Sequence, residues 1–191
     1  MDTTALRARA LTLLDEEIRN KNLVKHNLAA GALMKALAVR FGEGERADLW
    51  ELAGLLHDLD WEKLQDEPTR HTELAAEILR AEGFPEEVVE AIWRHNFHAN
   101  HPAPETPMEL ALYYGEEITG LVVAATLVSP TKKLADMTGE TVLRRLSERS
   151  FARGVDRELL GAAPEKLGIS LLELAETAVR AMQGISGELG L

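Results

Sequence analysis

The stretch "LLHDLDW", residues 55–61, decides how this chain is interpreted. A run of leucines ends in the adjacent pair His57 and Asp58, and a second carboxylate, Asp60, follows two positions later. The residues before the pair, 52–56, should carry a helix into the core. Ionisable side chains are costly in a core unless they are paired or bound to a metal. The stretch therefore needs partners for His57 and Asp58 from elsewhere in the chain.

Composition narrows the class of protein. The 191 residues suit one domain with a substantial core, and 46% hydrophobic with 28% charged residues is typical of a soluble globular protein without a membrane span. The charged N-terminal segment does not resemble a signal peptide, so we expect a cytoplasmic protein. Because cysteine is absent, any metal must be held by nitrogen and oxygen. The net charge of −11 opposes binding to a nucleic-acid polymer.

The hydrophobic pattern predicts helices almost throughout. Apolar residues recur at helical spacing, and strand-like alternation is nowhere sustained. After a first helix near the N-terminus, we expect helices over about 23–41, 45–57, 69–82, 85–95, 107–128 and from 170 onward. Capping boxes at Thr106–Glu109 and Ser170–Glu173 mark the last two starts. The expected fold class is a single all-α domain, with a motif-bearing core over about 21–130 and a helical extension over about 131–191.

All six histidines lie between positions 26 and 101. His26, His71 and His95 each fall on the apolar face of a different predicted helix, and His57 closes a fourth. A single histidine on such a face is more often an ordinary core residue. One divalent cation shared by several imidazoles is nevertheless simpler than a separate buried partner for each.

These residues carry a family resemblance. The order of His26, His57-Asp58 and a later acidic helix resembles the H…HD…D signature of the HD-domain superfamily of metal-dependent phosphohydrolases, and more closely small stand-alone bacterial HD proteins. The motifs are "LVKHNLAAGALMKALA", "LAGLLHDLDWEK", "RHTELAAEIL", "IWRHN", "ELALYYGEEITGLVVAATLVSP" and "SFARGVDRE". The resemblance implies a helical bundle with His26, His57, Asp58 and Glu116 as metal ligands. Glu116 replaces the family's usual aspartate, so a working ligand and a degenerate site both remain open.

Two nitrogens and two carboxylates suit one divalent transition metal (Mn, Fe, Co, Ni or Zn) better than Ca or Mg. Such a metal would activate a water and offset phosphoryl charge, which indicates hydrolysis of a small phosphate ester; the resemblance extends this to a nucleotide. Two other hypotheses stay open: a catalytically degenerate HD-fold module that binds a ligand or partner, and a di-iron oxygenase. Whether the chain forms a homo-oligomer is open as well.

Further residues have expected roles around this set. Asp60 is the first candidate for a general base, with capping of the loop after its helix as the equal alternative, and Glu62 is the second. His71, His95 and Asn96 are candidates for a second metal or for substrate phosphate. Four basic residues are weaker candidates for phosphate contacts, each more often a solvated charge: Lys25, Arg70, Arg94 and Lys132. His98 and His101, in a proline-rich loop, are expected at the surface, with a place at the edge of the pocket as the alternative.

Overall fold

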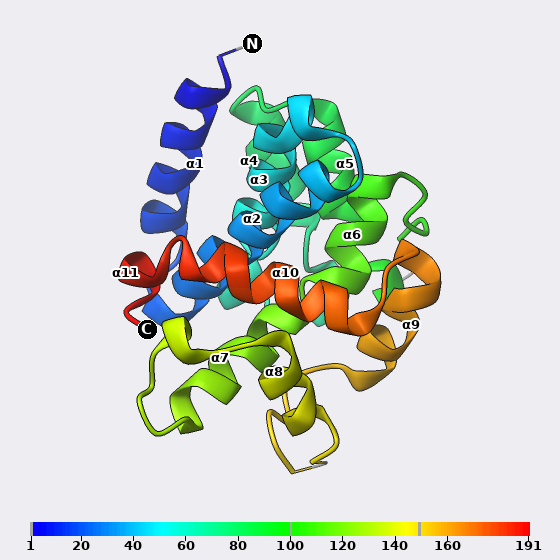
Figure 1. Ribbon diagram of the computed structural model, residues 1–191. Helices are drawn as coiled ribbons and strands as arrows, with labels where there is room; N and C mark the ends of the chain where they lie inside the picture. The colour runs from blue at the N-terminus through cyan, green and yellow to red at the C-terminus, as the bar shows by residue number, and fades with distance from the viewer. Residues whose placement is uncertain (1, 100, 149) are drawn as a thin grey trace.

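The computed structural model describes residues 2–99, 101–148 and 150–191, and within these ranges all regular structure is helical, without a strand (Figure 1). The predicted all-α fold is thus confirmed. The helices are α1 Thr3–Glu17, α2 Lys21–Arg40, α3 Ala47–Leu56, α4 Glu73–Ala81, α5 Glu86–Arg94, α6 Pro107–Gly115, α7 Ile118–Val128, α8 Gly139–Leu146, α9 Arg157–Leu167, α10 Leu171–Gln183 and α11 Ser186–Leu189.

The helices with the most extensive mutual contact are α2 and α3. Glycine makes this approach feasible, because a Cβ at Gly54 would lie 2.6 Å from the Ala30 carbonyl and 2.7 Å from the Gly31 amide nitrogen. At one end of the pair, the imidazoles of His26 and His57 meet with ring centroids 5.0 Å apart. Packing of α2 on α3 is therefore what brings the first two histidines together.

The C-terminal helices cover the N-terminal ones. In Figure 1, α10 crosses the bundle in front of α2, and it packs against α2, α7 and α8, while α9 packs against α6. Buried residues of α8, α9, α10 and α11 belong to the same hydrophobic core as those of α1 to α7. Residues 131–191 therefore complete the core rather than form a separate one.

The structure divides the helix expected over 107–128. The capping box at Thr106 and Glu109 is present and opens α6, but α6 ends at Gly115 and α7 begins at Ile118. Glu116 and Glu117 stand at the junction between the two helices. The helix expected over 69–82 was also too long, since α4 begins at Glu73 after a separate turn.

The segment Pro107–Val128 is the one stretch of the described residues that is long and apolar enough to cross a membrane by length and composition. Its most apolar window is 61% buried within the fold. Because α6 and α7 both contribute to the hydrophobic core, their apolar character is explained by packing.

Candidate metal centre

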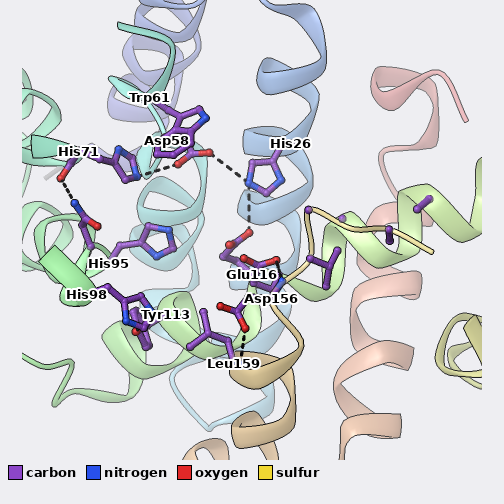
Figure 2. Close-up of a pocket in the computed structure, with 17 residues that line it drawn as sticks. His26, Asp58, Trp61, His71, His95, His98, Tyr113, Glu116, Asp156 and Leu159 are labelled. Carbon is purple, nitrogen blue, oxygen red and sulfur yellow. Dashed lines mark hydrogen bonds and ion pairs between the residues drawn. The ribbon is translucent and has the colours of Figure 1, made fainter. Parts of the chain in front are cut away.

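Four side chains from α2, the end of α3 and the α6–α7 junction converge on one point. Figure 2 shows three of them, His26, Asp58 and Glu116. His26 Nε2 lies 3.1 Å from His57 Nε2, 3.6 Å from Asp58 Oδ2 and 3.3 Å from Glu116 Oε2. His57 Nε2 lies 3.6 Å from Asp58 Oδ2 and 4.0 Å from Glu116 Oε2. The structure thus brings together the four residues that the resemblance implied as ligands.

These separations match those of atoms around one ion. Ligand atoms about 2.1 Å from a transition metal are about 3.0 Å apart at a right angle and about 4.2 Å apart on opposite sides. All five distances above fall inside that range. In addition, Glu116 Oε2 is buried and has no hydrogen-bond partner among the described residues. The residues present therefore fit a divalent metal, which would satisfy this orphaned oxygen.

His57 is held ready to coordinate. Its Nδ1–H donates to the Gly54 carbonyl at 2.9 Å, which leaves the Nε2 lone pair facing the cluster. The imidazole is fully buried, and this burial lowers the pKa of His57 to about 4. His57 is consequently neutral near pH 7, the form that binds a metal.

Asp58 faces two sets of histidines with its two oxygens. Oδ2 lies toward His26 and His57, whereas Oδ1 is 3.2 Å from His71 Nε2. Burial alone would raise the pKa of Asp58, but the adjacent imidazoles His57, His71 and His26 hold it well below its usual range. The ionised carboxylate can therefore serve one ion at each oxygen.

His95 extends the cluster toward that second position. Its ring lies 4.9 Å from the ring of His57, and one nitrogen of His95 comes within 4.8 Å of ligand atoms of both Asp58 and His71. His95 Nδ1 is buried without a hydrogen-bond partner among the described residues. Two groups of three ligands, one with His26 and one with His71 and His95, thus share Asp58.

Burial raises the pKa of Glu116 well above its usual range, and the nearby carboxylates Glu117 and Asp58 add to the effect. A divalent cation beside the carboxylate would reverse this by favouring its ionised form. The position of Glu116 therefore fits either a protonated acid or a metal ligand, and the convergence of His26 and His57 on its Oε2 favours the ligand.

One wall of a cavity of about 570 Å³ is formed by His26, Asp58, His71, His95 and Glu116, whereas the fully buried His57 does not line it. The remaining walls come from Trp61, Asn96, His98, Tyr113, Glu117, Gly120, Ala124, Ala152, Gly154, Val155, Asp156 and Leu159. Sequence reasoning assigned no site role to Glu117, Asp156 or the loop before α9, although this loop is the "SFARGVDRE" motif. No lysine or arginine occurs among the described residues that line the cavity.

The carboxylate of Asp60 does not face this cavity, which corrects its expected role as a general base. It is fully buried, and it accepts hydrogen bonds from His71 Nδ1 at 2.7 Å, Thr72 N at 3.2 Å and Ala75 N at 2.9 Å. Both oxygens are therefore engaged, and Asp60 positions the His71 ring and the start of α4. Burial alone would lower the pKa of His71, but the two carboxylates, Asp58 and Asp60, raise it to about 9.

Glu62 lies outside the cavity as well, so its expected catalytic role is corrected too. Its Oε2 accepts hydrogen bonds from the backbone N–H groups of Arg19 and Asn20 at 2.8 and 3.0 Å. These bonds connect the turn after α3 to the start of α2. Asn96 does line the cavity, and its amide donates to the carbonyls of Pro68 and His71.

The basic residues expected near phosphate do not line the cavity. Arg70 pairs with Glu67 and Glu73, and Arg94 donates to the Ala103 carbonyl beside acidic neighbours. Lys132 is exposed, and Lys25 lines a neighbouring groove instead. Arg70 and Lys132 are surface charges, the alternative that the sequence favoured for them, whereas Arg94 is 19% exposed and lies among acidic side chains.

The two histidines of the proline-rich loop, His98 and His101, differ in their exposure to solvent. His98 is exposed, as expected, yet it lines the cavity and its Nε2 lies 2.7 Å from Tyr113 Oη. His101 is only 9% exposed and its Nδ1 donates to the Trp93 carbonyl at 2.7 Å. The expectation that His101 is a surface residue is therefore wrong.

The comparisons with known proteins agree with this site. The model of the HD domain matches residues 23–128, so the chain belongs to the HD domain family. Ribonuclease Y from Sulfurovum sp. (strain NBC37-1) is 27% identical over 142 residues, which make up 73% of this chain and 27% of that protein. The chain thus spans little more than a quarter of this relative's length. No solved structure matches the chain significantly. Family membership places the chain in the superfamily of metal-dependent phosphohydrolases, and its His/Asp cluster can hold a metal.

Proposed function

We propose that this protein is a metal-dependent phosphohydrolase that acts on a small phosphate ester. The observation that carries the proposal is the convergence of His26, His57, Asp58 and Glu116 at coordination distances, with all but the fully buried His57 lining a 570 Å³ cavity. A divalent transition metal bound there supplies Lewis acidity and lowers the pKa of a coordinated water.

The residues of the chain would position the reacting groups. Gly54 and Asp60 fix the rings of His57 and His71 through Nδ1, so that His57 Nε2 faces His26 and Asp58, and His71 Nε2 faces Asp58. His71 and His95, together with Asp58, would hold the substrate phosphate, or a second metal that displaces the proton of His71. The charge of the bound metal is essential, because the described lining contains carboxylates but no lysine or arginine.

The same charge pattern favours a small ester over an RNA chain. The name of the relative, Ribonuclease Y, suggests a phosphodiester of RNA as the second candidate substrate. A polyanion gains its affinity mainly from lysine and arginine, whereas this chain has a net charge of −11. Cleavage of a single-stranded RNA oligonucleotide faster than of phosphomonoesters would favour the second candidate.

The test is metal analysis combined with hydrolysis. Purified protein supplied with Mn, Co, Ni or Zn should retain at least one ion per chain and hydrolyse small phosphomonoesters. Asp58→Asn keeps the shape of the side chain but removes its charge, so we expect metal affinity to fall at least 100-fold and hydrolysis to be lost.

The matched control is Asp66→Asn, the same change at an exposed position outside the cavity. This variant should retain the wild-type metal content and rate. Wild-type protein that retains no metal at micromolar supply would exclude the hydrolase. Metal retention without hydrolysis of any ester would favour the non-catalytic module, and two irons per chain with oxygen consumption would favour the oxygenase.

A further inference from the structure

A second hollow lies beside the metal cavity, between α2, α7 and the last residues of the chain. Its volume is about 440 Å³, within the usual range of small-molecule sites. We call it the α2–α7 groove. Most of its lining is apolar: Ala29, Gly120, Val123, Ala124, Leu127, Leu189, Gly190 and Leu191.

The groove and the metal cavity share a boundary. His26, Gly120 and Ala124 line both spaces. His26 belongs to the proposed metal cluster, and Gly120 contributes no side chain to the boundary. A phosphate held beside His26 would therefore have its organic group within reach of the groove.

A buried hydroxyl also indicates a ligand in the groove. Thr119 lines the groove, is fully buried, and its Oγ1 has no hydrogen-bond partner among the described residues. Thr126, equally buried on the same helix, donates to the Val122 carbonyl at 2.8 Å. Because a buried hydroxyl without a partner is unfavourable, the contrast points to an acceptor supplied from outside the protein.

We propose that the α2–α7 groove is the subsite for the organic part of the substrate, and that this part is apolar. The substrate class is then a phosphate ester of an aliphatic or aromatic alcohol that carries a hydrogen-bond acceptor for Thr119. This inference rests on the proposed function, since it takes the phosphate to lie at the metal cluster.

The test measures binding of n-alkylphosphonates, from methyl to octyl, to the Mn-loaded protein by calorimetry. These compounds are not hydrolysed, so the measurement does not depend on turnover. Each methylene that enters the groove should tighten binding about fourfold, the equivalent of about 0.8 kcal/mol, until the groove is filled. An affinity that does not change with chain length would overturn the proposal.

Two neighbouring residues of α7 provide a matched pair of variants. Leu127 is 50% exposed and lines the groove, whereas Val128 is 51% exposed and does not line it. We expect Leu127→Asp to abolish the increase in affinity with alkyl chain length and to leave the affinity for methylphosphonate unchanged. Val128→Asp should behave as wild type. An equal increase in affinity with chain length in both variants would place the alkyl chain elsewhere.

The outcomes separate the groove from the hydrolase. If affinity rises with chain length but no ester is hydrolysed, the groove assignment stands and the proposed function fails. If esters are hydrolysed without preference for longer chains, the proposed function stands and the groove assignment fails. If not even methylphosphonate binds the metal-loaded protein, the phosphate site is absent and both fail.

Discussion

The two aspartates of "HDLD" have different tasks although only one residue separates them. Asp58 faces the histidines of the cavity, whereas Asp60 faces the backbone at the start of α4. Thr72 shows how strongly the contact between Asp60 and the backbone constrains the chain. Its φ is +75°, which is unfavourable for a β-branched residue. Its N–H donates to Asp60, and its hydroxyl donates to the Trp93 carbonyl.

Replacement of Asp60 by asparagine should therefore weaken metal binding, although Asp60 itself takes no direct part in the reaction. Asparagine keeps the shape but cannot accept from His71 Nδ1 and from both backbone amides as the carboxylate does. We expect metal affinity to fall by about 10- to 100-fold and the free energy of unfolding by about 1–3 kcal/mol. A competition titration with a chromophoric chelator and urea unfolding measure the two effects.

The control for this variant is Glu62→Gln. Glutamine retains a carbonyl oxygen for the N–H groups of Arg19 and Asn20, and the residue lies outside the cavity. Its metal affinity and rate should stay within about twofold of wild type. An Asp60→Asn protein with normal metal affinity but no turnover at any pH would restore Asp60 as a general base.

The sequence could place side chains on faces but could not orient them. Helical periodicity put His26 and Glu116 on inward faces, and both reach the cluster. The difference between Asp58 and Asp60 depends on a turn whose dihedral angles have no periodic pattern. Glu117 and Asp156 escaped prediction because the loop before α9 meets the α6–α7 junction only through tertiary packing, with Asp156 N donating to Glu117 Oε2 at 3.2 Å.

Among the helices, the pair α2 and α3 has the strictest steric requirement. A methyl group at Gly54 would collide with the backbone of Ala30 and Gly31, and backbone cannot move aside as a side chain can. Since the same contact aligns His26 with His57, the glycine links packing to the metal site.

Gly54→Ala should consequently reduce the free energy of unfolding by about 3 kcal/mol and also weaken metal binding. Urea unfolding and a metal titration measure both. Gly161→Ala is the matched control, because Gly161 lies on the exposed face of α9 and a methyl group added there would have no neighbour within 4 Å. This control should be stabilised by about 0.5–1 kcal/mol. Equal stability of the two variants would contradict the role of Gly54.

Caps and periodicity predicted the helices up to Val128 and α10, whereas the sequence assigned no bounds to α8 and α9. The Thr106 and Ser170 caps begin α6 and α10 as expected. The α6–α7 junction was missed because apolar residues continue on both sides and Glu116 and Glu117 keep helical dihedral angles. The start of α4 was misplaced because Pro68–Arg70 forms its own 3-10 turn and Thr72 departs from helical geometry.

The stability of the complete fold should reflect the opposite protonation of two buried histidines. In the metal-free protein, burial lowers the pKa of His57 to about 4, whereas Asp58 and Asp60 overcome burial and raise that of His71 to about 9. In the unfolded chain both should titrate near a pKa of about 6.5. His57 therefore destabilises the fold as the pH falls from about 6.5 to 4, and the contribution of His71 is lost as the pH rises from about 6.5 to 9.

From these two groups alone, the stability of the metal-free protein should be greatest near pH 6.5 and fall by about 3 kcal/mol toward either limit. Urea unfolding in the presence of EDTA, measured between pH 4 and 9, tests this. His71→Asn should reduce the loss on the alkaline side, where the raised pKa of buried Glu116 also contributes, and leave the acid side unchanged. His57→Asn should reduce the loss on the acid side, where buried His95 also contributes, and leave the alkaline side unchanged. A wild-type protein equally stable at pH 6.5 and pH 9 would show that His71 is not held in its protonated form by the two carboxylates.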